Sequence, residues 1–408
     1  MTRIEPQSWM TAPAANKLMA ALGQARFVGG AVRNTLLGKP VTEVDIATPL
    51  VPAEVEKRLV AAGIKPVPTG IEHGTITAVV DGKPYEVTTL RRDVETDGRR
   101  AVVAFTTDWA EDAQRRDFNM NALYASADGE VFDTVGGVED LKAGRVRFVG
   151  DAVTRIREDY LRILRLFRFH AWYGKGEIDA DALRAATQEK RGIAKLSGER
   201  IAKEMLRLLE AGSPVAVLRT MAQAAILSEV LPGEPNVARL AHLVAIDVVN
   251  FFPPDPLLRL AALLPGKDSA VPPVEFVEAI AGRWKLSKAQ RERLEAVARA
   301  DEHVALDLSA REVRKLSYRL GKRLLIDLLF LKWAEDPKPA VDWRALLVIA
   351  EAWERPRFPL TGADVMRAGV PEGPLVGRVL CELEAWWIDG DFAADASALA
   401  ERLKAAVR

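Results

Sequence analysis

The sequence predicts an α+β protein whose strands lie near its N-terminus. Within the first 150 residues, short runs rich in β-branched residues alternate with helical patterns, whereas beyond this point apolar residues recur at helical spacing to the C-terminus. A chain of 408 residues is too long for one ordinary core, which indicates several domains. We therefore expect a small mixed sheet with its helices, followed by parts that are entirely helical.

Clusters of glycine and proline mark where these parts end. Gly212-Ser-Pro214 interrupts the helical pattern, and Arg355-Pro-Arg-Phe-Pro359 interrupts it again. We therefore expect four domains. They are a head over residues 1–150, a helical neck over 151–212, a helical body over 213–355 and a C-terminal tail over 356–408.

The composition excludes several classes of protein. Charge is balanced, with 57 basic and 57 acidic residues, so any binding of nucleic acid must come from local clusters of Lys and Arg. Cys381 is the only cysteine, which excludes a disulfide framework and a cysteine-based zinc site and favours a reducing cytoplasm. No apolar stretch is long enough to span a bilayer. We expect a soluble, cytoplasmic monomer without membrane contact.

The segment Phe27–Asn34 predicts a strand, a glycine turn and a helix. Phe27 and Val28 are strand formers, and the apolar residues after the turn are spaced for a helix. Gly29 and Gly30 permit positive φ angles, and a backbone of this shape offers N–H groups to a phosphate. Both glycines are therefore candidate nucleotide-binding residues.

Acidic and apolar residues alternate in Glu43-Val-Asp-Ile46. On a strand, Glu43 and Asp45 would share one face while Val44 and Ile46 face a core. Two adjacent carboxylates repel each other unless a divalent cation lies between them. The pair therefore predicts a magnesium site directly after the glycine turn.

The next elements follow from local patterns. Residues 53–62 are spaced for a helix. Asp81-Gly82 separates two β-branched runs, 74–80 and 85–90, and so predicts a hairpin. His73 lies just before the first run, where we expect a packed residue rather than a catalyst.

The rest of the head predicts a loop, a helix and a last strand pair. Arg91–Arg100 is charged and has little to bury, so we expect a mobile loop. A helix over Trp109–Gln114 follows. Residues 131–135 and 145–149 then favour two strands on either side of a Gly-Gly turn.

The glycine turn and the acidic pair resemble the signature of the nucleotidyltransferase superfamily, in particular the bacterial class II group of CCA-adding enzymes and poly(A) polymerases. The family pattern is Gly-Gly-x-Val-Arg-Asp followed by Asp-x-Asp, with a threonine shortly after. Asn34 and Glu43 depart from it, since the family has aspartate at both positions. The resemblance implies that Arg33 binds nucleotide. The matching residues are Gly29, Gly30, Val32, Arg33, Asp45 and Thr48.

Two further segments resemble family motifs. Glu86-Val-Thr-Thr-Leu-Arg91 matches in full, and with strand geometry this makes Glu86 a candidate third carboxylate beside the metal pair. Arg115-Arg-Asp-Phe-Asn-Met-Asn121 is similar to Arg-Arg-Asp-Phe-Thr-Ile-Asn. Forked arginine donors suit triphosphate oxygens, and an aspartate can accept from a ribose hydroxyl. The nucleotide-binding candidates from this segment are Arg116, Asp117 and Asn121.

The segment Arg157–Arg168 predicts a helix that reads a nucleotide base. Asp159 and Arg162 lie three residues apart and would share one helix face. The carboxylate would accept from the amine of cytosine or adenine, and the guanidinium would donate to the adjacent ring nitrogen. Uracil and guanine present the reverse order, so we expect the pair to select C and A. This agrees with the family, whose Glu-Asp-x-x-Arg motif reads the incoming base.

Basic residues continue along and beyond this helix. We expect Arg165 and Arg168 to face substrate phosphates. Ser197 is the predicted N-cap of a later helix, in which Arg200 would hold the neck to the head. Residues 283–288 and 311–323 concentrate positive charge that could follow a tRNA backbone. The tail aromatics Trp386 and Trp387 are expected in a core.

The resemblance implies a CCA-adding tRNA nucleotidyltransferase with tRNA, CTP and ATP as substrates and Mg²⁺ as cofactor. The tRNA 3′-hydroxyl would attack the α-phosphorus of CTP or ATP, and Glu43, Asp45 and Glu86 would be the catalytic carboxylates. A poly(A) polymerase is the first alternative, but the Arg-Phe-Arg-rich run of those relatives is not found between Pro66 and Val80. An enzyme that adds only C or only A, and a weakened RNA-binding relative, also remain open.

Overall fold

The structure of the chain is a computed structural model that describes residues 2–71, 74–97, 100–301, 303–338 and 340–407. His73 lies outside the described residues. The chain forms two compact units, one comprising Met1–Pro232 with Gly282–Lys285, the other comprising Gly233–Ala281 and Leu286–Arg408. The expected division into four domains stays a prediction.

The first unit contains a seven-stranded sheet with the order β3-β4-β5-β2-β1-β8-β9. Strand β2 runs parallel to β5, and the other neighbours in the sheet are antiparallel. The sheet is therefore mixed, which confirms the predicted α+β class. The strands are β1 Arg26–Val28, β2 Asp45–Thr48, β3 Lys65–Gly70, β4 Thr75–Val80, β5 Lys83–Thr89, β8 Leu123–Ala125 and β9 Val131–Asp133.

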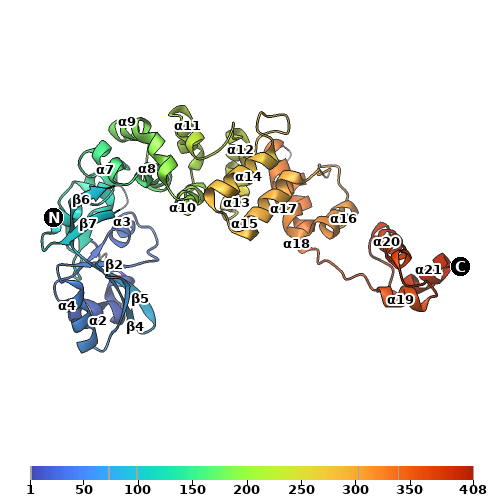
Figure 1. The fold of residues 1–408 in the computed structure, drawn as a ribbon, viewed down its shortest axis with the longest axis horizontal. Helices are drawn as coiled ribbons and strands as arrows, with labels where there is room; N and C mark the ends of the chain where they lie inside the picture. The colour runs from blue at the N-terminus through green and yellow to red at the C-terminus, as the bar shows by residue number, and fades with distance from the viewer. Residues whose placement is uncertain (1, 72–73, 98–99, 302, 339, 408) are drawn as a thin grey trace. The chain divides into compact units, whose positions relative to one another are not determined.

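Short helices cover this sheet. Helices α2 and α4 pack against each other and against β4, as Figure 1 shows, and α3 packs against β1 and β8. Apolar side chains fill the interface, with Phe27 and Ile46 fully buried. The helices of this part are α1 Ser8–Thr11, α2 Pro13–Leu22, α3 Gly30–Leu36, α4 Pro52–Ala61, α5 Trp109–Gln114 and α6 Gly137–Ala143, with a 3₁₀ turn η2 at Asn119–Asn121.

Local turn chemistry predicted two of these elements correctly. The β4–β5 hairpin turns at Asp81 and Gly82, whose φ angles are 50° and 76°. Both residues are left-handed, as a two-residue hairpin requires. Helix α5 has the predicted bounds, and the side chain of Asp108 accepts from the Ala110 N–H to begin it.

The loop predicted at Arg91–Arg100 is wrong. Strand β6, Arg91–Asp97, pairs with β7, Arg100–Phe105, in a separate antiparallel two-stranded sheet. The charged run by itself predicts a loop, but the apolar, β-branched run Ala101–Phe105 that follows supplies a partner strand. Pairing with β7 therefore makes a strand of a segment that its own composition predicts as a loop.

The last predicted strand pair is only half correct. Strand β9 pairs with β8, but residues 145–149 form no strand and make a single bridge between Phe148 and Phe118. Gly136 is left-handed and begins α6, so the chain does not return as a hairpin. Instead, the Val149 N–H donates to the Asp117 carbonyl at 3.1 Å and holds that residue in place.

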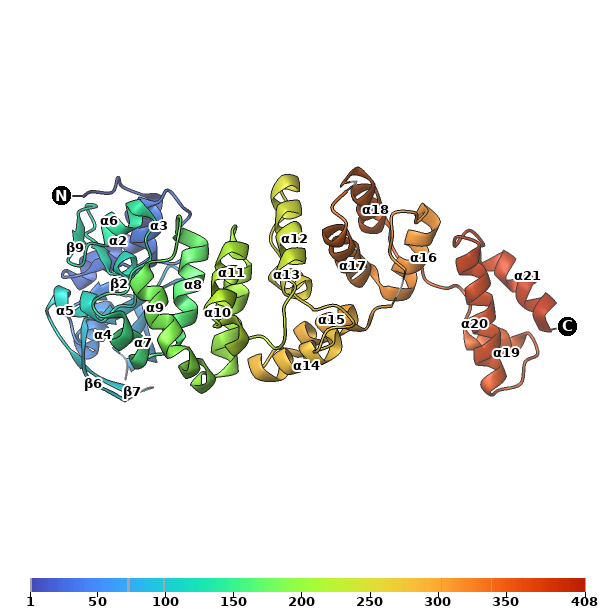
Figure 2. The same cartoon turned by 90° about the horizontal axis from the view of Figure 1, so that it is seen from above.

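Five helices complete the first unit. Helix α8 packs against α10 and α11, and these helices run side by side in Figure 2. The predicted apolar stripe of α8 is buried, including Leu164 and Phe167. Ser197 lies at the predicted N-cap of α10, although its side chain makes no capping bond. The helices are α7 Ala152–Glu158, α8 Leu161–Tyr173, α9 Ala180–Glu189, α10 Gly198–Leu209 and α11 Pro214–Gln223, and a 3₁₀ turn η3 spans Lys190–Lys195.

The second unit is helical. A buried ion network joins three of its helices, because Arg293 of α15 pairs with Asp255 before α13 and with Asp327 of α17, both at 2.8 Å. Burial raises the pKa of Asp327 to about 6, although Arg293 opposes the shift. The helices are α12 Val237–Asn250, α13 Pro256–Ala262, α14 Pro273–Trp284, α15 Lys288–Arg299, α16 Ala310–Leu320, α17 Lys322–Glu335, α18 Ala340–Ala352, α19 Gly362–Arg367, α20 Pro374–Asp389 and α21 Ala396–Val407.

The predicted tRNA-binding charges of this unit have carboxylate partners. Arg314 pairs with Asp391, and Lys315 pairs with Asp389 at 2.7 Å. Part of the positive charge is thus neutralised within the unit, and its role toward tRNA stays a prediction. No helix in the described ranges is long and apolar enough to cross a membrane.

The two tail tryptophans differ in burial. Trp387 belongs to a core cluster with Tyr318, which confirms its predicted place. Trp386 is exposed, and the guanidinium carbon of Arg402 lies 5.4 Å from its ring centroid, so the expectation of a core position is wrong for this residue.

The buried imidazole of His170, near the end of α8, gives the first unit a titratable weak point. His170 is 8% exposed, and its Nε2 lies 3.2 Å from the Gly176 carbonyl. Its Nδ1 has no hydrogen-bond partner among the described residues, and a Cβ at Gly174 would lie only 2.3 Å away from it. Burial lowers the pKa of His170, so the native state resists a second ring proton.

We predict that stability falls as the pH is lowered through the unfolded pKa of histidine, about 6.5, because there the unfolded state binds a proton that the native state does not. Thermal unfolding followed from pH 7.5 to pH 5 measures this. His170→Gln keeps a donor for the Gly176 carbonyl and cannot titrate, so its midpoint should depend less on pH. An unchanged dependence in this variant would assign the effect to other groups.

Candidate active site

The glycine turn brings the start of α3 next to an arginine. Gly29 has a φ of 65°, which requires glycine, and its N–H donates to the Leu123 carbonyl at 3.0 Å. This N–H is therefore used within the sheet and is not offered to a phosphate. A Cβ at Gly29 would lie 3.7 Å from Nη1 of Arg116, so a guanidinium lies directly beside the turn.

Arg116 is held in this position by a buried carboxylate. Its Nε and Nη2 donate to Oδ2 of Asp112 at 3.2 and 3.0 Å, and Nε also lies 3.2 Å from the Tyr124 hydroxyl. Asp112 is fixed in turn by the Tyr124 hydroxyl at 2.6 Å. The guanidinium is thus oriented before any ligand binds, which lowers the entropic cost of binding an anion.

The parallel pairing of β2 with β5 places Asp45 opposite Glu86. Glu43 precedes the strand, which begins at Asp45, so the prediction of a shared strand face for Glu43 and Asp45 is wrong. Burial, the charge of Glu86 and then that of Glu43 raise the pKa of Asp45 to about 6, while Arg116 opposes the shift. The charges of Glu86 and Glu43 therefore both act on Asp45 at the start of β2, in the middle of the sheet, and Glu86 is the partner of Asp45 in the strand register.

This donor set fits a metal that binds together with substrate. No group of three or more His, Cys, Asp or Glu side chains in the described part of the chain could hold a metal by itself. Mg²⁺ usually takes one or two protein carboxylates, with waters and substrate phosphates completing an octahedron. Asp45 and Glu86 supply such a pair, and a cation would offset the burial and the repulsion that together raise the pKa of Asp45.

Arg33 lies inside the protein and joins three elements. It is 8% exposed, and burial lowers its pKa. Its Nη1 donates to Oδ1 of Asn121 at 2.5 Å, and its Nη2 donates to the Tyr173 hydroxyl at 2.8 Å at the end of α8. This geometry makes Arg33 a link between α3, η2 and α8, and its binding of nucleotide stays a prediction.

Asn34 uses both ends of its amide. Its Oδ1 accepts from Nε and Nη2 of Arg33 at 3.1 and 2.9 Å, and its Nδ2 donates to the Pro40 carbonyl at 2.8 Å. Arginine can only donate and a carbonyl can only accept, so the orientation of the amide is fixed. Asn34 thereby holds the segment that leads from α3 to Glu43.

Asp117 is the centre of a buried network. Its Oδ1 accepts from the Phe118 N–H at 2.9 Å and from Nδ2 of Asn121 at 3.0 Å, and its Oδ2 accepts from Nε of Arg165 at 2.8 Å. Burial would raise the pKa of Asp117, but the Arg165 guanidinium and these hydrogen bonds outweigh it and hold the pKa below its usual range. Asp117 is therefore a charged carboxylate whose two oxygens already have partners.

Glu204 of α10 extends this network. Arg165 lies 3.8 Å from its carboxylate and Arg168 pairs with it directly. Arg168 also lies over the Phe169 ring, with its guanidinium carbon 4.3 Å from the centroid. The two arginines predicted to face substrate phosphates are thus each paired with a carboxylate of the protein.

Asp159 and Arg162 do not share one helix face, contrary to the prediction. Helix α7 ends at Glu158 and α8 begins at Leu161, and Asp159 between them is extended, with φ −154° and ψ 105°. The Asp159 carboxylate accepts from the Leu161 N–H at 3.1 Å. A local side-chain bond of this kind competes with a continuous helix, and residue spacing alone cannot reveal it.

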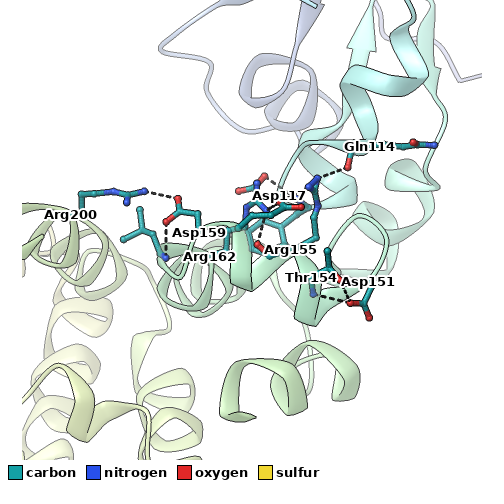
Figure 3. Close-up of polar contacts among 11 residues, drawn as sticks. Gln114, Asp117, Asp151, Thr154, Arg155, Asp159, Arg162 and Arg200 are labelled. Carbon is teal, nitrogen blue, oxygen red and sulfur yellow. Dashed lines mark hydrogen bonds and ion pairs between the residues drawn. The ribbon is translucent and has the colours of Figure 1, made fainter. Parts of the chain in front are cut away.

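The two residues are held separately, as Figure 3 shows. Nη2 of Arg200 donates to Oδ2 of Asp159 at 2.6 Å, while Nη1 of Arg162 donates to the Arg155 carbonyl at 2.6 Å and also pairs with Glu158. Arg200 was predicted to hold the neck to the head, but this contact joins α10 to the break between α7 and α8. The Asp159 carboxylate and the Arg162 guanidinium are therefore close in the chain but do not pair with each other.

Comparison with known proteins identifies the family. Residues 25–147 match the family described as "Poly A polymerase head domain", and residues 177–235 match "Probable RNA and SrmB- binding site of polymerase A". The mitochondrial CCA tRNA nucleotidyltransferase 1 of Danio rerio is 35% identical over 379 residues, which cover 89% of this chain and 83% of the relative. The CCA-adding enzyme of Leuconostoc mesenteroides is 32% identical and covers 97% and 96%.

The chain belongs to the CCA-adding enzyme family of nucleotidyltransferases. A solved structure of the Bacillus stearothermophilus CCA-adding enzyme in complex with CTP superposes with a TM-score of 0.75 and 27% identity, covering 98% of both chains. The predicted class II resemblance and the α+β fold are confirmed. As a nucleotidyltransferase of this family, the protein depends on a metal ion.

The sequence did not predict the contacts of two residues of the candidate site, Tyr173 and Glu204. Tyr173 orients Arg33, but no motif marks it. Glu204 could have been found, because an acidic residue lies between Ile201 and Leu208 on the apolar stripe of α10. A charge at a core position of an amphipathic helix needs a buried partner.

We predict that Asn34→Asp, which restores the family residue, loosens the segment between α3 and Glu43. A carboxylate cannot donate to the Pro40 carbonyl, so hydrogen exchange of the backbone amides of residues 38–44 should become about fivefold faster, as the loss of one ordinary hydrogen bond implies. Thermal stability should change little, because the new charge pairs with Arg33. Unchanged exchange in this segment would show that the Nδ2 bond does not hold it.

Proposed function

We propose that this protein adds C, C and A to the 3′ end of tRNA from CTP and ATP, without a nucleic-acid template. The observation that carries the proposal is the separate support of Asp159 and Arg162. Both hydrogen bonds that the Arg162 guanidinium makes within the described residues use Nη1, so Nε and Nη2 are left to donate to a base. A carboxylate offers about four lone-pair sites, and Asp159 uses one on each oxygen.

This pair of groups has the polarity of a template for C and A. Asp159 accepts from N4 of cytosine or N6 of adenine, and Arg162 donates to N3 or N1 beside it. Uracil and guanine present a carbonyl next to an N–H in the same order. Each would leave polar groups unpaired, which costs about 1–3 kcal/mol for each buried neutral group.

We assign the transferase chemistry to the carboxylates of the neighbouring strands β2 and β5 and to the residues around them. The tRNA 3′-hydroxyl attacks the α-phosphorus of the bound nucleotide, and pyrophosphate leaves. Asp45 and Glu86 would hold Mg²⁺, with Glu43 acting through a water, and when bound the ion supplies charge that lowers the pKa of the hydroxyl and neutralises the triphosphate. Arg116, already oriented beside the turn of Gly29 and Gly30, binds triphosphate oxygens.

The buried network keeps these groups in place. Asp117 accepts from a ribose hydroxyl on a remaining lone pair, while Asn121, Arg165 and Arg168 hold it and its surroundings at fixed positions. Arg33 supports the same arrangement from α3. We assign the binding of tRNA to the helical body and tail, and we propose a monomer that acts in a reducing cytoplasm.

The decisive experiment offers tRNA that lacks its 3′ end together with each labelled nucleotide in turn. The proposal expects two additions from CTP alone and one further addition when ATP is also present. Continued addition from ATP would identify a poly(A) polymerase. Addition of only C or only A would identify a partial enzyme, and no addition of any nucleotide would leave an RNA-binding relative.

We predict that Asp45→Ala lowers nucleotide incorporation by at least about a thousandfold while tRNA binding and folding persist, because only the ion cluster is lost. Glu43→Ala is the matched comparison and should reduce incorporation far less, since Glu43 lies outside the strand. Incorporation assays across a range of Mg²⁺ concentrations measure both. Near-normal activity of Asp45→Ala would remove Asp45 from the mechanism.

We predict that Arg162→Ala relaxes discrimination against UTP and GTP by about tenfold or more, and slows the use of CTP and ATP by a smaller factor. The physical reason is that the donor that rejects a ring N–H is gone. The measurement is the ratio of kcat/KM for CTP over UTP and for ATP over GTP. Slow incorporation of every nucleotide with unchanged ratios would make Arg162 structural.

A further inference from the structure

Arg155, in the last turns of α7, is a buried cation that touches both parts of the site. It is 7% exposed. Its Nη2 donates to the Gln114 carbonyl at 2.8 Å, and its Nη1 meets Oε2 of Glu158 at 2.5 Å. Gln114 is the last residue of α5, and Arg115, Arg116 and Asp117 follow it directly. Figure 3 shows Arg155 lying between the end of α5 and Arg162.

The same residue also fixes the guanidinium of Arg162. The Arg155 carbonyl accepts from Nη1 of Arg162 at 2.6 Å. Oε2 of Glu158 accepts from Nη1 of Arg155 and from Nη1 of Arg162. The side chain of Arg155 therefore determines how much of the Glu158 carboxylate is available to Arg162. The buried guanidinium of Arg155 and the half-buried guanidinium of Arg162 share one carboxylate oxygen, and each needs its second partner to stay in place.

We propose that Arg155 is a positioning residue for base selection, which fixes the base-reading Arg162 relative to the triphosphate-binding segment at Arg116. This inference rests on the proposed function, in which Arg162 reads the base. If the end of α7 moves away from α5, Arg155 loses the Gln114 carbonyl, turns toward Glu158 and displaces Arg162. The base is then read from a position that no longer matches the triphosphate.

If Arg155 only stabilised α7, the loss of another arginine of this helix should affect base selection equally. Arg157, two residues along the same helix, pairs with Glu189 of α9 at 2.8 Å and, in the described part of the chain, makes no hydrogen bond or ion pair with α5. Arg157→Ala therefore loosens α7 without touching the link to α5 or to Arg162. It is a matched control for the loss of an arginine and of an ion pair on this helix.

The experiment compares Arg155→Ala and Arg157→Ala by kcat/KM for CTP over UTP and for ATP over GTP, with thermal unfolding measured alongside. We expect Arg155→Ala to lower both ratios about tenfold, since a hydrogen bond to a charged group is lost. We expect Arg157→Ala to leave them within about twofold, the usual size of a surface-pair effect. Equal slowing of all four nucleotides by Arg155→Ala, with unchanged ratios, would overturn the inference.

A double-mutant cycle tests whether Arg155 acts through Arg162. In a protein that already carries Arg162→Ala, the substitution Arg155→Ala should change the ratios no further. Arg155→Lys covers the case in which the alanine variant does not fold, because it keeps the charge near Glu158 but lacks the fork that reaches two acceptors. It should also lower the ratios, whereas wild-type ratios in Arg155→Lys would overturn the inference.

The outcomes separate this inference from the proposed function. If Arg162→Ala leaves the ratios unchanged, the proposed template is wrong. If Arg162→Ala relaxes them and Arg155→Ala does not, only the role of Arg155 is wrong. The ratio of the dissociation constants of CTP and UTP, measured for each variant by equilibrium dialysis without tRNA, compares the variants independently of turnover.

Discussion

The half-buried ion pair between Asp117 and Arg165 is the constraint on which the site depends. It fixes the segment after α5 to the middle of α8, and Asn121, Arg33 and Glu204 extend it in both directions. A charge withdrawn from water needs a partner, so the loss of either residue would leave the other uncompensated. The segment that follows α5 and the helices α8 and α10, which carry Arg165 and Glu204, are therefore joined by electrostatics as well as by apolar packing.

The balanced composition has a local explanation. Arg116, Arg155, Arg165 and Arg168 each lie against a carboxylate of the protein, so the positive charges of the site are largely compensated. Such pairs orient a guanidinium but leave part of its fork for a ligand. A protein that binds triphosphates and RNA can therefore have a net charge of zero. Hydrogen-bond donors held in fixed positions recognise the ligand, so an excess of positive charge over the whole protein is not needed.

Sequence reasoning succeeded where the signal is local. Gly29 and the Asp81-Gly82 hairpin were predictable because few residues tolerate left-handed backbone. It failed where a distant partner decides, as for β6, which needs β7, and for residues 145–149, which lie against Asp117. For the candidate site residues, the sequence predicted roles only where a motif resembles that of the family. The break at Asp159 depends on one side-chain bond, which spacing cannot show.

The two acidic positions of the proposed metal site, Glu43 and Asp45, differ in how far their backbones can adjust, because β2 begins at Asp45. Asp45 belongs to a strand paired on both sides, so a longer side chain there would displace its carboxylate with no compensating movement. Glu43 lies in the segment before the strand, where a small change in backbone angles can absorb an extra methylene. Position 43 can therefore carry either acidic residue, whereas position 45 fits only the shorter one.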